Sequence, residues 1–412
     1  MNLIQQIPLL HERRILLGVT GSIAAYKAAD LASKLTQAGA LVDVILSEAA
    51  QKFISPITFQ SVTGRMVYTD VEFWSSEAHI LHVGLAENAD LFIIAPVTAN
   101  TIGKLANGLA DSLLTVTALA VSCPLILAPA MDAHMYQNPV VQDNLRILRK
   151  RGVVEIEPAE GRMASGLIGK GRLVETRELI GHIRREFGRK GPMAGLRFVV
   201  TAGGTQEPID AVRTITNRSS GKQGFALAQA ALDRGADVVL ITGPSHLQTP
   251  IGAERINVHT ASEMKDVVLE KIDKVDVLLM AAAVADFRSV KTSVEKIKRR
   301  KGIPQIQLES TEDILALVAD HRRKKGWPRL MVGFAAESED LVANARAKLE
   351  EKDLTLVVAN DITALDAGFE VDTNQVTLID AEGGVQELPL MTKTEVAESV
   401  LQRVLQLLET VE

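Results

Sequence analysis

Cysteine is almost absent from this 412-residue sequence: Cys123 is the single one, so no intrachain disulfide can form. That excludes a disulfide-stapled secreted scaffold and makes a reducing cytoplasm the compartment we expect. Aromatic residues are also scarce, at 4% of the chain. Small and branched aliphatic residues are abundant instead, which favours open parallel α/β sheets, because their strands are buried on both faces.

An excess of basic charge is also lacking. Lys and Arg number 45 against 51 Asp and Glu, which leaves a net charge of −6. Proteins that bind nucleic acid or an anionic membrane over a large surface usually have the opposite balance, so we expect neither partner. With 47% apolar and 23% charged residues, the composition is that of a globular chain and excludes a disordered or collagen-like one.

No segment has the pattern of a signal peptide or of a membrane span. Residues 1–14 lack a basic region followed by a long apolar one. Residues 112–131 carry no charge and are long enough to cross a bilayer, but Pro124 and several hydroxyl side chains interrupt them. We predict a buried helix over 112–121 and a buried strand over 125–129 instead.

The same pattern occurs twice along the chain, at 14–46 and at 197–242. In each, a β-branched run ends in glycine, a helix of 3.6-residue period follows, and a Gly-Ala pair precedes a second buried strand. This is the βαβ unit, whose two strands are parallel and whose crossover is right-handed. Each repeat therefore predicts the start of a parallel sheet.

Further strands extend both sheets. They are predicted at 91–95, 125–129, 153–156, 276–281, 330–335, 355–359 and 375–379. Gly, Pro and charged residues concentrate at 188–195, as at a domain joint. We therefore predict two doubly wound, Rossmann-like α/β domains, residues 1–190 and 191–412, with an amphipathic helix at 393–409 closing the chain.

Ligands of doubly wound sheets bind beyond the carboxyl ends of the strands. Gly21 and Ser22 follow the first strand, where backbone N–H groups at a helix start can hold a phosphate. The G-x-G-x-x-G fingerprint is absent, and Ser47 rather than an acid follows the second strand, although Glu48 comes next. An NAD(P)-dependent oxidoreductase is thus the weaker interpretation, and a turn without any ligand stays open.

Four other motifs mark the first half. His82 precedes an Ala-Asp pair at 89–90, PVTANT occupies 96–101, PAMDAHMY occupies 129–136, and GRMASGLIGKGR occupies 161–172. A lone histidine is more often structural than catalytic. Taken together, however, the four motifs resemble those of the flavin-dependent cysteine decarboxylases.

That resemblance implies an FMN-dependent decarboxylation in the first half, because an adjacent electron sink is needed when CO₂ leaves a cysteine carboxylate. It implies that His82 is the acid–base residue. Asp132 stands where the family has an asparagine that grips the substrate carboxylate, and Ser165 stands where it has a flap cysteine. The residues implied for FMN are Gly21, Ser22, Ser47, Thr98, Ala99, Asn100 and Thr101.

The second half carries its own ordered set of motifs. These are VTAGGTQEPIDAVRTITNRSSGKQG at 200–224, AAAVADF at 281–287, VEKIK at 294–298, VGFAAES at 332–338, a lysine pair at 348 and 352, and VVAND at 357–361. A phosphate loop of the Walker type is disfavoured, because Lys222 is followed by Gln223. Singly, Lys296 could lie on a solvated face and Asp286 could cap a turn. As a set, the motifs resemble the bacterial phosphopantothenate–cysteine ligases.

The ligase resemblance implies a CTP-dependent amide synthesis through an acyl cytidylate. Residues implied for CTP are Ala281, Ala282, Asp286, Lys296, Phe334, Lys348 and Lys352. The three lysines would neutralise the triphosphate together with Mg²⁺, whose ligands the sequence does not identify. Phe334 would border the cytosine, Asp286 would hold the ribose or base, and Asn217 would donate a hydrogen bond to the acyl oxygen. The family string K-N-P-D-I is S-T-E-D-I here, at 310–314.

Both resemblances together cover the chain from about residue 13 to 405. In this order they match the bifunctional ligase–decarboxylase family of coenzyme A biosynthesis, in which the product of the second half is the substrate of the first. The substrates implied are 4′-phosphopantothenate, cysteine and CTP, and the implied assembly is a homo-oligomer. A non-catalytic nucleotide-binding regulator remains the alternative from another class, beside the NAD(P)-dependent oxidoreductase.

Overall fold

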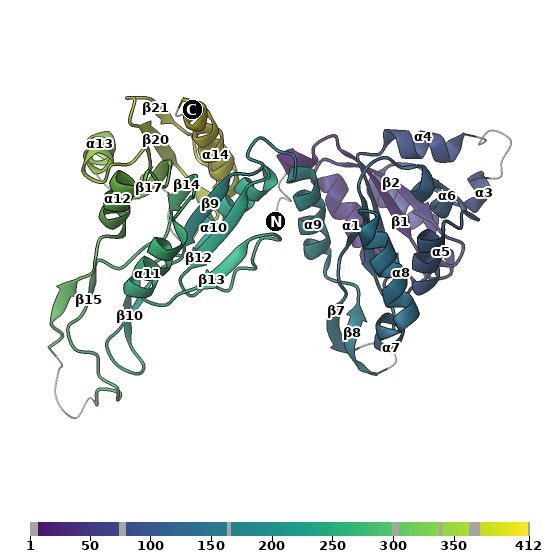
Figure 1. The fold of residues 1–412 in the computed structure, drawn as a ribbon, viewed down its shortest axis with the longest axis horizontal. Coiled ribbons are helices and arrows are strands. Elements are labelled where there is room, and N and C mark those ends of the chain that lie inside the picture. Colours follow the sequence, from purple (N-terminus) through teal and green to yellow (C-terminus); the bar gives the residue numbers. More distant parts are fainter. Residues whose placement is uncertain are drawn as a thin grey trace. The chain divides into compact units, whose positions relative to one another are not determined.

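The computed structural model describes residues 7–73, 80–162, 166–298, 305–337, 340–361 and 371–410. It divides into two compact units, Met1–Glu186 and Phe187–Glu412. Each unit is built on a sheet with helices packed against it (Figure 1). The α/β fold class predicted from the sequence is confirmed.

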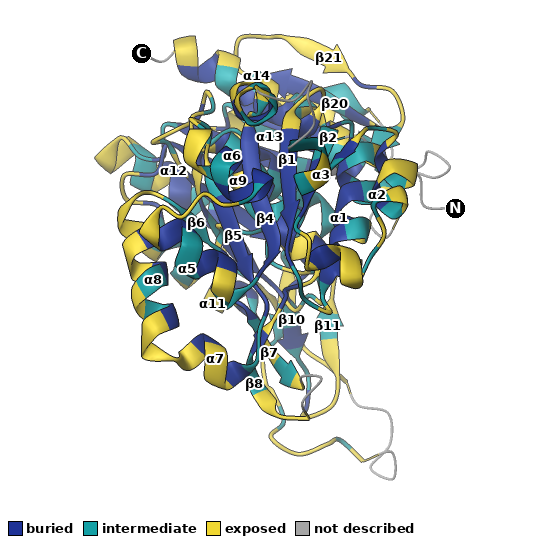
Figure 2. Ribbon diagram, turned by 90° about the vertical axis from the view of Figure 1, so that its right-hand side faces the viewer, coloured by how far each residue is buried: buried dark blue, intermediate teal, exposed yellow. Residues whose placement is uncertain are grey.

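The first unit contains a six-stranded sheet in the order β3-β2-β1-β4-β5-β6, with every pair parallel. The strands are β1 (Arg14–Val19), β2 (Leu41–Leu46), β3 (Val67–Tyr68), β4 (Leu91–Val97), β5 (Leu125–Pro129) and β6 (Val154–Glu155). Every residue of β4 is buried, as expected for a strand covered by helices on both faces. Figure 2 shows β1, β4 and β5 as a buried layer inside the fold.

Helices alternate with these strands. They are α1 (Ala25–Gln37), α2 (Pro56–Thr63), α3 (Asp70–Phe73), α4 (Leu81–Asn88), α5 (Ala99–Asn107), α6 (Leu113–Ala120), α7 (Ala133–Gln137), α8 (Pro139–Lys150) and α9 (Thr176–Gly188). The uncharged segment from residue 112 forms α6 and then β5, which confirms the predicted helix and strand. Among the helices in the described ranges, none is long and apolar enough to cross a membrane.

A short antiparallel hairpin follows β6 in the first unit. It is formed by β7 (Ala159–Arg162) and β8 (Ile168–Arg172), within the glycine-rich segment predicted as a flap. The amide of Met131 donates to the carbonyl of Gly171 at 3.0 Å. This bond fixes the base of the hairpin beside the loop that follows β5.

The second unit contains an eight-stranded sheet in the order β13-β12-β9-β14-β17-β18-β20-β21. The strands are β9 (Arg197–Ala202), β12 (Asp237–Thr242), β13 (Glu254–Asn257), β14 (Val277–Met280), β17 (Leu330–Glu337), β18 (Leu356–Asp361), β20 (Val376–Asp380) and β21 (Val385–Glu387). Pairs from β13 to β18 are parallel, but β20 and β21 are antiparallel. The strand predicted at 375–379 therefore exists, whereas its parallel direction was wrong. An apolar run signals burial and says nothing about the direction of its partner.

The helices of this unit are α10 (Lys222–Asp233), α11 (Ala261–Lys271), α12 (Ile314–Lys325), α13 (Leu341–Glu351) and α14 (Lys393–Thr410). The predicted closing helix at 393–409 is confirmed as α14. Its buried face includes Val400, Val404 and Leu408, spaced by four residues, and it packs against α10 in the main core of the unit.

Three small ribbons complete the second unit. They pair β10 (Gln206–Pro208) with β11 (Thr214–Thr216), β15 (Phe287–Ser289) with β16 (Leu308–Ser310), and β19 (Thr373–Asn374) with β22 (Met391–Thr392), all antiparallel. We call residues 206–216 and 287–298 the arm, because β10 packs on β15 and both project from the sheet (Figure 1). The sequence predicted a ligase motif over residues 200–224 but did not predict that this segment contains a hairpin.

Candidate active sites

The residues implied for FMN lie beyond the carboxyl ends of three neighbouring strands of the first sheet. Gly21 and Ser22 follow β1, Ser47 follows β2, and residues 98–101 follow β4. Strands β2, β1 and β4 are neighbours, and the order of connection reverses between β1 and β4. That reversal is the topological switch point, where the loops diverge and leave a crevice for a ligand.

A buried threonine joins the two loops that border this switch point. Thr20 is 1% exposed. Its hydroxyl donates to the carbonyl of Pro96 at 2.8 Å and accepts from the amide of Thr98 at 3.0 Å. Nothing in the sequence marks Thr20, because a hydroxyl at a strand end carries no signal of its partner. These two hydrogen bonds show that Thr20 links the segments after β1 and β4.

Glycine is needed at position 21 for close packing. A Cβ built there would lie 2.5 Å from the Cβ of Ala49, nearer than real side chains approach. The loops after β1 and β2 therefore meet closely because residue 21 has no side chain.

Helix α5 begins at the predicted flavin segment. Thr98 is its N-cap and accepts from the amide of Thr101 at 3.4 Å, and the two hydroxyls are 3.2 Å apart. Asn100 is exposed and Ala99 is partly buried at the helix start. The amino end of a helix carries partial positive charge and backbone donors, which suit a phosphate.

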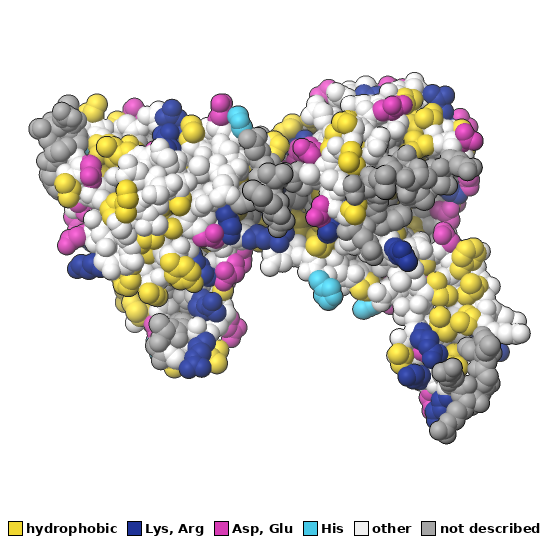
Figure 3. Space-filling model, turned by 180° about the vertical axis from the view of Figure 1, so that it is seen from behind, with side chains coloured by type: hydrophobic (Ala, Val, Ile, Leu, Met, Phe, Trp, Pro, Cys, Tyr) yellow, Lys and Arg dark blue, Asp and Glu magenta, His cyan; other side chains and the backbone are white. Residues whose placement is uncertain are grey.

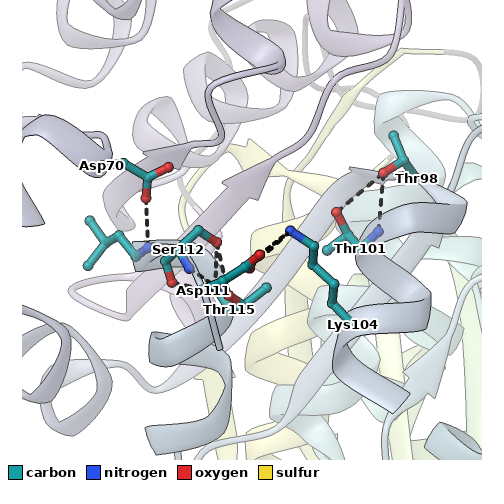
Figure 4. A network of polar contacts seen from close by, with 8 residues as sticks. Asp70, Thr98, Thr101, Lys104, Asp111, Ser112 and Thr115 are labelled. Atoms are coloured by element: carbon teal, nitrogen blue, oxygen red, sulfur yellow. Dashed lines mark hydrogen bonds and ion pairs between the residues drawn. The ribbon is translucent and has the colours of Figure 1, made fainter. Parts of the chain in front are cut away.

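A polar network continues from α5 to the start of α6 (Figure 4). Lys104 pairs with Asp111 at 2.8 Å, and Ser112 and Thr115 form a capping box on α6. Asp70 accepts from the amide of Leu113 at 2.7 Å. These bonds join the last turn of α5 and the start of α3 to the amino end of α6.

His82 lies on α4, which packs against α6. Its ring meets Phe73 edge-on, with centroids 5.8 Å apart. Within the part of the chain that the structure describes, its Nδ1 atom is buried and has no hydrogen-bond partner. Buried ring nitrogens are nearly always paired, so this atom is a candidate contact for a group outside the described residues.

Asp132 caps α7, and its carboxylate accepts from the amide of His134 at 3.0 Å. The helix is anchored by Tyr136, whose hydroxyl donates to Glu155 at 2.9 Å. Because Met131 bonds to the hairpin of β7 and β8, Asp132 lies next to the predicted flap. Ser165, predicted to belong to that flap, lies outside the described residues.

The second unit holds a cavity of about 630 Å³ at the carboxyl ends of β14 and β17. Six of the seven residues predicted to bind CTP line it, together with Asn217. They are Ala281, Ala282, Asp286, Phe334, Lys348 and Lys352. These residues come from segments far apart in the sequence, and the loops after the strands bring them around one space.

Lysine and asparagine side chains in this cavity are held in place. Lys348 donates to the carbonyl of Phe334 at 2.7 Å. Lys352 pairs with Glu351 and, at 2.9 Å, with Asp313, and these bonds raise the pKa of Lys352 above its usual range. Asn217 donates through Nδ2 to the carbonyl of Val284 at 2.8 Å. The cavity therefore presents ordered donors, two of them charged.

Several lining residues were given no role by sequence reasoning, among them Gln223, Asn360, Asn374 and Lys393. Asn374, 1% exposed, donates to the side-chain oxygen of Asn360 at 3.0 Å. Lys393, 6% exposed, donates to the carbonyl of Val371 at 2.6 Å. Burial first, and then the charge of Lys222, lower the pKa of Lys393 to about 8. The VVAND string could have pointed to Asn360, but nothing local points to Lys393.

Lys296 is the exception among the predicted CTP residues. It is exposed on the arm and is not among the residues that line the cavity. The physical reason is that its loop is bonded to the hairpin of β10 and β11 rather than folded over the strand ends. In the described ranges, no group of three or more His, Cys, Asp or Glu side chains could hold a metal ion.

Comparison with known proteins gives a family for each half of the chain. Residues 8–188 match the family described as Flavoprotein, and residues 193–408 match the family described as DNA/pantothenate metabolism flavoprotein C-terminal domain. The coenzyme A biosynthesis bifunctional protein CoaBC of Bacillus subtilis is 45% identical over 399 residues, which are 96% of this chain and 97% of that protein. The chain belongs to the CoaBC family.

Other members of the CoaBC family match at similar length. The CoaBC protein of Vibrio cholerae is 42% identical over 391 residues, 94% of this chain and 97% of its own. Among solved structures, the C-terminal domain of a CoaBC protein covers 53% of this chain and 99% of its own, with 38% identity and a TM-score of 0.46. The resemblance to a bifunctional enzyme of coenzyme A biosynthesis is confirmed, and the family favours neither the oxidoreductase nor the regulator.

Proposed function

We propose that the second unit joins 4′-phosphopantothenate to cysteine with CTP and Mg²⁺, and that the first unit decarboxylates the product with FMN to give 4′-phosphopantetheine. The observation that carries the proposal is the cavity in the second unit. It collects Asn217, Phe334, Lys348 and Lys352 around one space although they are spread along the chain. We place the functional boundary between residues 190 and 191.

The residues at the switch point of the first sheet suit FMN. The start of α5, the turn at Gly21 and the hydroxyls of Ser22 and Ser47 can hold a phosphate and a ribityl chain. When bound, FMN would supply the oxidation that turns a substrate thiol into an electron sink for decarboxylation. The Nδ1 atom of His82, which no described residue pairs, is a site for holding or moving a proton. Asp132, oriented by the amide of His134, would lie beside the substrate carboxylate under the flap.

The cavity of the second unit suits an acyl-transfer reaction on a nucleotide. A carboxylate does not react with an amine in water, so it must first displace pyrophosphate from the α-phosphate of CTP. Lys348 and Lys352 would offset the negative charge that develops as pyrophosphate leaves. Cysteine's amine would then attack the acyl carbon and release CMP. Asn217 would donate to the acyl oxygen, where charge develops during that attack.

The remaining assignments follow from the same proposal. The ligands are small molecules: phosphopantothenate, cysteine and CTP, with FMN and Mg²⁺ as cofactors. We propose a homo-oligomer in the cytoplasm, on the strength of the family resemblance and the single cysteine.

Two variants test whether the two activities are separate. His82→Asn should abolish CO₂ release from phosphopantothenoylcysteine by the FMN-loaded protein but leave CTP-dependent pyrophosphate release unchanged. Asn217→Asp should do the reverse, slowing conversion of the acyl cytidylate to the amide by about 100-fold, because an anion replaces a donor at the developing negative charge. Each variant is the control for the other. Loss of both activities in either variant would contradict separate sites.

A further inference from the structure

The arm of the second unit contains a carboxylate that the proposed chemistry does not use. Asp210 sits in the turn between β10 and β11, and its side chain is 0% exposed. Burying a carboxylate is unfavourable unless its oxygens are well hydrogen-bonded. The oxygens of Asp210 accept four hydrogen bonds, two on each oxygen.

One carboxylate oxygen of Asp210 stabilises the turn of the hairpin. Oδ1 of Asp210 accepts from the amides of Val212 and Arg213, each at 2.8 Å. Both donors are close in sequence, so these bonds only shape the hairpin.

The other oxygen reaches outside the hairpin. Oδ2 accepts from the guanidinium of Arg213 at 3.0 Å and from the amide of Ile297 at 3.1 Å. Ile297 follows Lys296, so this atom connects the side chain of Arg213 to the backbone next to Lys296. Although burial raises the pKa of Asp210, the backbone donors and the charge of Arg213 lower it overall, so the group stays ionised.

Two more bonds tie the same loop to the hairpin. Ser293 donates through its amide to Ile209 at 3.0 Å, and the hydroxyl of Thr292 donates to Pro208 at 3.2 Å. They lie at the other end of the loop from Lys296. Among the described residues, the bond from the Ile297 amide to Oδ2 of Asp210 is therefore the one that holds the part of the loop next to Lys296.

This connection brings basic side chains together on an exposed surface. The side chain of Arg213 is 46% exposed despite its bond to Asp210, and Lys296 and Lys298 are exposed. Figure 3 shows Lys and Arg side chains gathered on the arm. Strand β11 (Thr214–Thr216) lies between Arg213 and Asn217, which lines the cavity, and the step between these two residues spans about 13 Å at ~3.3 Å per residue. The basic surface is thus connected to the ligase site by one short strand.

We propose that Asp210 is a positioning residue: it holds Arg213 and the Lys296 loop together as one cationic surface that binds a phosphate-bearing substrate of the ligase. The inference rests on the proposed function, because that function supplies the phosphorylated substrates. When two cationic side chains are already held in place, they lose less conformational freedom on binding a phosphate than mobile ones do.

The two oxygens allow a sharp test with Asp210→Asn. The amide oxygen of asparagine can still serve the amides of Val212 and Arg213, so the turn is kept. Its NH₂ group then faces the Ile297 amide and the guanidinium, which are donors too, so the connection between the loops is lost. Glu207→Gln is the matched control. Glu207 is a buried acid on the same hairpin, 3% exposed, whose bond to the Ala261 amide at 2.7 Å the glutamine oxygen retains.

The experiment measures KM for each substrate and amide hydrogen exchange in the full-length protein. We expect Asp210→Asn to raise KM for phosphopantothenate or CTP about tenfold, the effect of losing one charge-assisted arrangement. KM for cysteine, which has no phosphate, should stay unchanged. The Ile297 amide should exchange faster while the Val212 and Arg213 amides keep their protection, and Glu207→Gln should match the wild type.

Three outcomes would overturn the inference: unchanged KM for both phosphorylated substrates, an equal rise for cysteine, or faster exchange without any change in KM, which means a structural role alone. If the wild-type protein releases no pyrophosphate, the proposed function fails. Calorimetric titration of CTP and of phosphopantothenate into both proteins then still tests Asp210, because equal affinities for wild type and variant would contradict the positioning role.

Discussion

At the scale of single residues, Lys352 is a cation already balanced by carboxylates. It contacts Asp313 and Glu351 in the cavity of the second unit. A bound triphosphate would compete with these partners for the same ammonium group. The side chain is therefore both a nucleotide ligand in our account and a structural link between α13 and the start of α12.

The first prediction concerns that lysine. Lys352→Gln should raise KM for CTP by about tenfold or more, because a charged hydrogen bond to phosphate contributes roughly 1.5–3 kcal/mol. Steady-state pyrophosphate release measures it. Lys271→Gln is the control, since Lys271 also pairs with two glutamates but does not line the cavity. An unchanged KM in Lys352→Gln would remove the lysine from the nucleotide site.

The second prediction uses the buried Lys393. Its pKa is lowered from 10.5 to about 8. Between these two values the unfolded chain binds more protons than the folded one, so this group makes the free energy of unfolding rise with pH over that window. Below about pH 8 the contribution no longer changes.

Chemical unfolding of the wild type and of Lys393→Met between pH 7.5 and 10 measures this effect. Relative to the variant, the wild type should gain on the order of 1 kcal/mol across the window. Other titrating groups cancel in the difference. Parallel pH profiles for the two proteins would show that the lysine titrates normally.

Some of these residues could be predicted from the sequence and others could not. Phe334, Lys348 and Asp286 were found because the resemblance carried them as part of ordered motifs, and the structure brings them to one cavity. Thr20, Asn374 and Lys393 were missed because their importance comes from partners distant in the chain. Lys296 was expected beside the other lysines. Hydrogen bonds from its loop to the hairpin of β10 and β11 hold it elsewhere, and the sequence pattern does not predict these bonds.

At the scale of elements, buried strands and helices could be predicted from the sequence more easily than short polar ribbons. Apolar runs predicted β4, β5 and α14 well, because burial on two faces or along one helix stripe leaves a clear pattern. The direction of β20 and the ribbons of the arm were not predictable in the same way. Short polar strands and antiparallel edges are fixed by pairing partners rather than by their own composition.

The third prediction compares two helix caps. Thr98→Ala removes the cap of α5, and Ser112→Ala removes the cap of α6. Each should lower the free energy of unfolding by about 1 kcal/mol. Only Thr98→Ala should also weaken FMN retention, because only α5 begins at the predicted flavin site.

Thermal unfolding and flavin absorbance after gel filtration provide the two readouts. Equal flavin content in the two variants, whether both keep FMN or both lose it, would contradict the placement of FMN at the start of α5.

At the scale of the whole molecule, two units with separate cores carry two successive reactions. The first unit has its loops at the switch point between β1 and β4, and the second has its cavity at the carboxyl ends of β14 and β17. The chemistry orders them: an amide of cysteine must exist before its carboxylate can be lost. The scarcity of cysteine in the chain fits a protein whose thiol chemistry takes place on the substrate, with Ser165 where a flap thiol is expected.

The most direct test of the central claim is a single incubation. The FMN-loaded protein is mixed with 4′-phosphopantothenate, cysteine, CTP and Mg²⁺, and the products are identified by mass. The account predicts 4′-phosphopantetheine, together with CMP, pyrophosphate and CO₂, and no product when CTP is left out. Unchanged phosphopantothenate would contradict the ligase assignment, and accumulation of phosphopantothenoylcysteine without phosphopantetheine would contradict the decarboxylase assignment.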